Sequence, residues 1–163
     1  MYTIVPHLLR RTVKVAVIGC GGTGSAILAG LPHLHQALVA SGHPSGLAVT
    51  VIDGDRISPA NCVRQPFSEG EIGLFKAVVL VNRLNLFWGL KWEAVPNHVS
   101  NAHGIANDTD LVIGCVDTRR ARASSRSISS SIAESRCDPS WARGRDECTP
   151  SSRIFCVGLS RSR

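Results

Sequence analysis

The sequence predicts an α/β protein with a doubly wound, mainly parallel sheet. Three strand patterns, "VKVAVIG", "LAVTVIDGD" and "DLVIGCVD", occur at residues 13–19, 47–55 and 110–117. Each contains a mainly apolar run, which is typical of a parallel strand that is covered on both faces. Helical patterns stand between them, and strands that alternate with helices imply right-handed crossovers within one sheet.

The remaining elements follow in order between these strands. After the first strand, an apolar-periodic helix is expected over residues 24–40, with Pro32 as a candidate bend. The text "SGHPSG" at residues 41–46 predicts a loop. A second helix is expected around residues 77–87, followed by a short strand in "WEAVPNHV" at residues 92–99.

The loop after the first strand is rich in glycine and predicts a phosphate site. Gly19, Gly21 and Gly24 satisfy G-x-G-x-x-G between a strand and a helix, and Gly22 stands among them. Such glycines allow a tight turn, the approach of phosphate to the backbone, and close helix packing. Asp53, at the end of the second strand, is placed to accept hydrogen bonds from ribose hydroxyls. This Rossmann-like pattern alone does not distinguish a redox dinucleotide from ATP.

The connection after the second strand favours ATP. Within "DGDRISPANCVRQPFSEGEIGLFKA" stand Asp55, Asn61, Arg64, Gln65 and Lys76. Arginine and lysine suit a polyphosphate, whereas hydride transfer needs a flat apolar slot for nicotinamide. Stabilisation of developing negative charge is what phosphoryl and nucleotidyl transfer require.

Five motifs stand in a fixed order between residues 13 and 122. They are Gly19-x-Gly21-Gly22-x-Gly24, Asp53-x-Asp55, Asn61-x-x-Arg64-Gln65, Gly73-x-x-Lys76 and Asp117-Thr118-x-x-x-Arg122. In this combination the sequence resembles the ThiF/MoeB family, the bacterial relatives of ubiquitin-activating enzymes. Within that family, "GCGGTGSAILAGLPHLHQAL" and "VLVNRLNLFWGL" are most similar to ThiF-like members of the PRTRC system.

The resemblance implies an activity, in which ATP adenylates the C-terminal glycine carboxylate of a small ubiquitin-like protein and pyrophosphate is released. Arg64 and Lys76 would neutralise the triphosphate and the charge at the α-phosphorus, and Asp117 would bind or orient Mg²⁺. A helix cap after a buried strand is the alternative role for Asp117. The implied protein is a homodimer that uses ATP and Mg²⁺.

The implied nucleotide site combines the glycine loop with the polar loop. The glycines would hold the phosphates, Asp53 the ribose, and the neutral amides would donate further hydrogen bonds. The full set of expected nucleotide-binding residues is Gly19, Gly21, Gly22, Gly24, Asp53, Asp55, Asn61, Arg64, Gln65 and Lys76.

Some family features do not occur in this sequence. No CxxC pairs stand where many members bind zinc, so no zinc site is expected. Cys20, Cys62 and Cys115 are interpreted as packing residues rather than as acceptors for sulfur or thioester transfer. Arg10 and Arg11 are candidates for the arginine that in some members reaches the neighbouring subunit's site.

Residues 123–163 differ in character from the rest. They hold 12 Ser and 7 Arg, no Lys and no sustained periodicity, which is typical of disorder. The family resemblance ends near residue 122, which favours a truncated or frame-shifted end. We therefore expect an incomplete ThiF-type nucleotide-binding domain over residues 1–122, with doubtful activity and an exposed sheet edge, and an irregular tail over 123–163.

The charge distribution and the lengths of the apolar runs bear on the class of partner and on the location of the protein. The net charge is +6, but residues 123–163 carry 7 Arg against 4 acidic residues, so a nucleic-acid partner depends on the tail and is disfavoured. No apolar run approaches the roughly 18 residues of a spanning helix, and no secretory signal is found, so a cytoplasmic protein is expected. The alternatives to an activating enzyme are a non-catalytic nucleotide-binding remnant or interaction module and, third, a Rossmann oxidoreductase.

Overall fold

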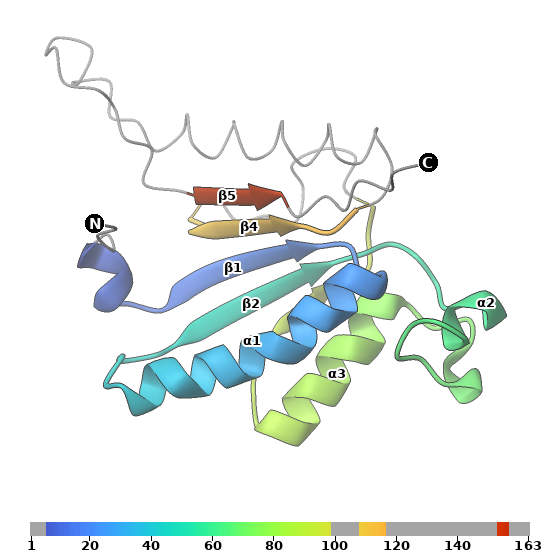
Figure 1. Cartoon of the computed structure of the whole chain (residues 1–163), viewed down its shortest axis with the longest axis horizontal. Helices are drawn as coiled ribbons and strands as arrows, with labels where there is room; N and C mark the ends of the chain where they lie inside the picture. Colours follow the sequence, from blue (N-terminus) through green and yellow to red (C-terminus); the bar gives the residue numbers. More distant parts are fainter. Residues whose placement is uncertain (1–5, 99–107, 117–152, 157–163) are drawn as a thin grey trace, which may run out of the picture.

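Five parallel strands form one sheet in the order β3-β2-β1-β4-β5. Figure 1 labels four of them, β2, β1, β4 and β5. The computed structural model of the chain describes residues 6–98, 108–116 and 153–156. The strands are β1 (Val13–Ile18), β2 (Leu47–Ile52), β3 (Glu93–Val95), β4 (Leu111–Gly114) and β5 (Arg153–Cys156). This order and direction confirm the predicted Rossmann-like sheet, and they place the chain's first strand in the middle.

The central strands bury both of their faces. Along β1, Val15 and Val17 belong to one apolar cluster, and Ala16 and Ile18 belong to another on the opposite face. Successive side chains of a strand point to opposite sides of the sheet, so apolar residues at every position imply two covered faces. This burial explains why "VAVI" is continuously apolar rather than alternating.

Helices α1 (Gly22–Ala40) and α3 (Lys76–Trp88) lie against the same face of the sheet (Figure 1). Leu28 of α1 and Val81 of α3 are almost fully buried in the larger apolar cluster with the β1 and β2 valines. The two predicted helices are confirmed, and α1 contains the buried Pro32 that was the candidate bend. No helix in the described residues combines the length and apolar character needed to cross a membrane.

Three short helical segments were not predicted from the sequence. They are η1 (Pro6–Leu9), α2 (Pro59–Cys62) and η2 (Glu69–Glu71). Each is only one turn, too short for apolar periodicity to show. For α2, a local signal was present, because Ser58 at the N-cap and Pro59 at the first helical position favour a helix start.

The edge of β4 is paired, so the expectation of an exposed edge there is wrong. Arg153–Cys156, from within the Ser/Arg-rich segment, pairs in parallel with Leu111–Gly114. A free strand edge presents unpaired N–H and C=O groups, and the short apolar segment "IFC" can supply a partner strand. The rest of the predicted tail, residues 123–152 and 157–163, lies outside the described residues.

Glu71 of η2 connects the loop that precedes α3 to a side chain of that helix. Its carboxylate accepts hydrogen bonds from the Ser68 backbone N–H, at 2.8 Å, and from the guanidinium of Arg83. Burial acts to raise the pKa of Glu71, but these hydrogen bonds and the nearby positive charge outweigh it, so the pKa lies below its ordinary value. The ionised form of Glu71 therefore stabilises the loop.

We expect this loop contact to weaken in acid. Because the pKa of Glu71 is lowered by folding, its contribution is fully present above the ordinary value of 4.5 and is lost as the pH falls through the folded-state pKa. Glu71→Gln should lower the free energy of unfolding at pH 7 by about 0.5–1 kcal/mol, and by less at pH 3, in urea titrations. The exposed Glu69→Gln is the control. An unchanged pH dependence in Glu71→Gln would contradict the assignment.

Candidate functional site

A cavity of about 440 Å³ opens at the carboxyl ends of the central strands. It lies where the strand order reverses, because the chain passes from β1 to β2 on one side of β1 and from β3 to β4 on the other, and open parallel sheets bind ligands at such a point. Eight of the residues predicted from the sequence line it, namely Gly19, Gly21, Asp53, Asp55, Asn61, Arg64, Gln65 and Lys76. Gly22 and Gly24 are not among the lining residues, and Asp117 lies outside the described residues.

The glycines of the loop have different structural roles. Gly19 has φ +97°, and a Cβ there would lie 2.8 Å from the carbonyl oxygen of Cys115. A Cβ on Gly24 would lie 1.9 Å from the carbonyl oxygen of Gly19, so Gly24 permits α1 to pack on the loop. A Cβ on Gly21 or Gly22 would meet nothing within 4 Å. Helix α1 begins at this open side without a side-chain cap, which leaves its first amides available to an anion.

Asp53 joins the glycine loop to the end of β2. One carboxylate oxygen accepts a hydrogen bond from the backbone N–H of Cys20 at 2.5 Å, and the other accepts one from the N–H of Asp55 at 2.8 Å. An ionised carboxylate has about four acceptor positions, so capacity remains for a ligand hydroxyl at the cavity. Asp53 thus joins the glycine loop to β2, and its role as an acceptor for ribose hydroxyls stays a prediction.

Lys76, the first residue of α3, places its ammonium group at the wall of the cavity. Its side chain is 8% exposed and its Nζ lies 3.2 Å from a carboxylate oxygen of Asp55, whose side chain is 57% exposed. The backbone N–H of Lys76 also donates to the Asp55 carbonyl oxygen at 3.0 Å. The packed stem of Lys76 fixes where the ammonium lies, while its exposed partner can be replaced by a phosphate.

The residues around α2 contribute one cation and two amides. Arg64 is exposed and forms no ion pair within the part of the chain that the structure describes. Asn61 is buried, and its Oδ1 accepts hydrogen bonds from the backbone N–H and the hydroxyl of Ser58, both at 3.0 Å. Gln65 Oε1 is buried and, among the described residues, has no hydrogen-bond partner. An unpaired buried acceptor is costly, so Gln65 is suited to a ligand donor.

The two buried cysteines near the cavity are not activated thiols. Burial raises the pKa of Cys115 to about 11. Burial and the neighbouring Asp53 carboxylate raise the pKa of Cys20 still further above its ordinary value. Both thiols therefore stay protonated at neutral pH, whereas a nucleophilic cysteine needs a lowered pKa. Both side chains belong to the larger apolar cluster, which agrees with packing roles.

Asn97 and His98 also line the cavity, and the sequence analysis missed them. They follow β3 as Asp53 follows β2, and this position after a predicted strand was the signal that could have found them. Gly54 makes room for His98, because a Cβ on Gly54 would lie 2.6 Å from the His98 backbone nitrogen and 2.8 Å from its ring. The packing of His98 therefore explains why the middle residue of Asp53-x-Asp55 is a glycine.

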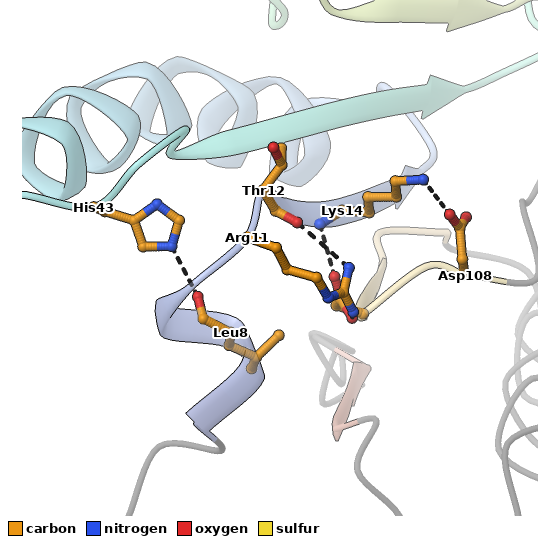
Figure 2. A network of polar contacts seen from close by, with 7 residues as sticks. Leu8, Arg11, Thr12, Lys14, His43 and Asp108 are labelled. Carbon is orange, nitrogen blue, oxygen red and sulfur yellow. Dashed lines mark hydrogen bonds and ion pairs between the residues drawn. The ribbon is translucent and has the colours of Figure 1, made fainter.

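Arg11 has a partner at the opposite end of the sheet. Its guanidinium lies 2.5 Å from the buried Asp110 carboxylate, which also accepts the backbone N–H of Lys14 at 3.0 Å. Figure 2 shows Arg11 in this network, together with the ion pair between Lys14 and Asp108. The six residues of β1 separate this network from the cavity by about 20 Å. Arg11 therefore ties the amino ends of β1 and β4 together.

The described part of the chain offers no cluster of metal ligands. Among residues 6–98, 108–116 and 153–156, no three His, Cys, Asp or Glu side chains form a group that could hold a metal ion. The predicted Mg²⁺ residue, Asp117, lies outside these ranges. Its role stays a prediction from the sequence.

Comparison with known proteins gives matches at the levels of family and fold. A sequence model described as the ThiF family matches residues 8–133, and so extends past residue 122 into the Ser/Arg-rich segment. A search of curated proteins found no match. A solved structure described as TcdA (CsdL) is similar, with 23% identity and a TM-score of 0.55 over 76% of this chain and 46% of that one.

Two further similar structures are of the E. coli tRNA N6-threonylcarbamoyladenosine dehydratase TcdA. In the complex with AMP, the identity is 26% and the TM-score 0.53, over 69% of this chain and 44% of that one. In the complex with ATP, the identity is 25% and the TM-score 0.50, with the same 69% and 44%. The matched region spans less than half the length of these proteins.

Proposed function

The chain belongs to the ThiF family, and on that premise we propose that it binds ATP in the cavity and uses it to adenylate a carboxylate. The observation that carries the proposal is the combination of an open glycine loop with two cations, Lys76 and Arg64, around one cavity. The similar TcdA structures in complex with AMP and with ATP support the choice of nucleotide. A nicotinamide-dependent oxidoreductase has no comparable support.

The proposed reaction needs positive charge on both sides of the α-phosphorus. A substrate carboxylate oxygen attacks that phosphorus, the bond to the bridging oxygen of the β-phosphate breaks, and pyrophosphate leaves. Both reactants are anions, so their approach requires fixed cations. Lys76 is fixed by packing and by Asp55, whereas the exposed Arg64 can approach from the cavity rim. Magnesium would share the pyrophosphate charge, and Asp117 is the residue proposed for it.

The proposed carboxylate substrate is the C-terminal glycine of a ubiquitin-like protein. This choice rests on the resemblance to ubiquitin-activating relatives, including the ThiF-like members of the PRTRC system. The same resemblance supports a homodimer, and we place the reaction in the cytoplasm. A second candidate substrate is an acid group on a modified tRNA, favoured by the similarity to a tRNA N6-threonylcarbamoyladenosine dehydratase.

ATP–pyrophosphate exchange tests these proposals together. The purified chain is incubated with ATP, labelled pyrophosphate and, separately, a candidate ubiquitin-like protein, tRNA, or no substrate. Exchange that depends on the protein with an intact C-terminal glycine supports the first proposal, and exchange that depends on tRNA supports the second. ATP binding without exchange under any condition would indicate a non-catalytic nucleotide-binding protein. Preference for NAD over ATP would overturn the proposal.

Arg64→Ala should reduce activity without reducing stability. Because Arg64 is exposed and has no ion pair in the described residues, we expect an unchanged melting temperature. Exchange should fall by about ten- to a hundredfold, since a charge-assisted contact to phosphate is lost. The matched control is Lys91→Ala, which removes an exposed cation that does not line the cavity. Equal rates in Arg64→Ala and the wild type would remove Arg64 from the site.

A further inference from the structure

We propose that Arg83 is a positioning residue for the nucleotide site, and that it acts by holding Arg64 in place at the cavity. This inference rests on the proposed binding of ATP, and it assigns a role to a side chain that belongs to none of the sequence motifs. Arg83 lies on α3 and does not line the cavity, so it makes no direct contact with a ligand there.

Arg83 joins α3 to two points of the loop between α2 and α3. Its Nη1 donates a hydrogen bond to the carbonyl oxygen of Pro66 at 2.5 Å, and its Nη2 donates one to the carboxylate of Glu71. A guanidinium presents its N–H groups in a rigid, planar fork, so the two acceptors are held in a fixed position relative to each other and to the helix. The contact with Pro66 is the one that lies next to the cavity residues in the chain.

Pro66 directly follows Arg64 and Gln65, which line the cavity. The Oε1 atom of Gln65 is buried, so packing helps to fix this side chain. Arg64 is exposed and has no ion pair among the residues that the structure describes, so its position depends on the backbone. On one side that backbone is held by the hydrogen bond from the Arg64 N–H to the Asn61 carbonyl oxygen, at 3.2 Å. On the other side it is held by the contact of Arg83 with Pro66.

Helix α3 thereby supports both cations of the cavity. Lys76 is its first residue, and Arg83 follows about two turns later on the same face. The helix carries the ammonium of Lys76 itself and, through Arg83, the backbone that carries Arg64. The separation of the two cations, which a triphosphate must match, is therefore set by one helix. Displacement of a positioned group by about 1 Å can cost up to about a hundredfold in activity.

A double-mutant cycle between Arg83 and Arg64, measured by calorimetric titration with ATP and with AMP, tests the inference. We expect Arg83→Ala to weaken ATP binding by about tenfold and AMP binding by less than about twofold, since Arg64 serves the triphosphate. In the Arg64→Ala background, Arg83→Ala should change ATP binding by less than about twofold, because the side chain that it positions is absent. Arg83→Lys keeps the charge but replaces the fork by a single ammonium, so ATP binding should weaken by about threefold.

Asn85→Ala is the matched control on the same helix. The Asn85 side chain also makes two hydrogen bonds with backbone, to the carbonyl oxygen and from the N–H of Trp92, at 2.9 and 3.0 Å, and neither residue lines the cavity. This variant should lower the melting temperature as Arg83→Ala does, and it should leave ATP affinity unchanged. Lys91→Ala, at an exposed lysine outside the cavity, controls for the loss of one positive charge.

The outcomes separate this inference from the proposed function. Unchanged ATP affinity in Arg83→Ala, or the same loss with and without Arg64, would overturn the positioning role and leave the proposed function intact. An equal loss of ATP affinity in Asn85→Ala would also overturn it, because the effect would then belong to the stability of α3. Absence of ATP binding in the wild type would overturn both. If Arg83→Ala does not fold, the same cycle with Arg83→Lys decides the question.

Discussion

Lys76→Met should lower ATP–pyrophosphate exchange by at least about a hundredfold, the largest effect expected of any single side chain in the cavity. Removal of one preorganised charge-stabilising group at a reacting centre commonly costs a factor of about 10² to 10³ in rate. Lys76 is more fixed than Arg64, because its stem is buried and its ammonium is held 3.2 Å from Asp55. Methionine retains most of the buried volume and removes only the charge.

The fold should survive this substitution. The Asp55 side chain that loses its partner is 57% exposed, so no uncompensated charge is left buried. Far-UV circular dichroism and the melting temperature check the fold, and Lys91→Met, at an exposed lysine outside the cavity, controls for the loss of a positive charge. Titration should show a greater loss of affinity for ATP than for AMP. An exchange rate within twofold of the wild type would exclude Lys76 from the chemistry.

Gly24→Ala should be the most destabilising single methyl addition in the glycine loop. The added Cβ would lie 1.9 Å from the carbonyl oxygen of Gly19 and 3.3 Å from Cys115 Cβ. The nearest obstacle is backbone, which cannot move aside as the end of a side chain can, so the start of α1 must separate from the loop. We expect a loss of about 3 kcal/mol or more in the free energy of unfolding, above the usual range for overpacking.

Gly22→Ala is the matched control in the same loop. A Cβ on Gly22 meets nothing within 4 Å, and alanine is favoured over glycine within a helix. Its free energy of unfolding, measured by urea denaturation, should be equal to or slightly above that of the wild type. If Gly22→Ala and Gly24→Ala were equally unstable, the close packing of α1 on Gly19 would be contradicted.

The parts of the fold that could be predicted are those in which buried positions give a recognisable pattern of apolar residues in the sequence. The mainly apolar segments at β1, β2 and β4 indicated strands covered on both faces, and their alternation with helices indicated a parallel sheet. Strand β5 was not predictable in this way, because four residues in a Ser/Arg-rich context show no period. Its place depends on the open edge that β4 presents.

The candidate site was predictable as a set of residues but not as an arrangement. The glycine spacing and the two aspartates of Asp53-x-Asp55 indicated a nucleotide site because strand ends bring them to one edge. Nothing local pairs Lys76 with Asp55, which stand 21 residues apart in the sequence. That ion pair depends on the path of the intervening loop, which the contact between Glu71 and Arg83 holds against α3.

The sequence by itself determined the parallel α/β sheet, the family, and which loop residues gather at the carboxyl ends of the strands. These follow from periodicity and from motifs that are contiguous in the chain. Only the tertiary structure decided that Asp53 ties the glycine loop to β2, that Lys76 is held by Asp55, and that His98 lies against Gly54 at the cavity. These contacts join segments that are distant in sequence, and their geometry arises only when the strands have taken their order in the sheet.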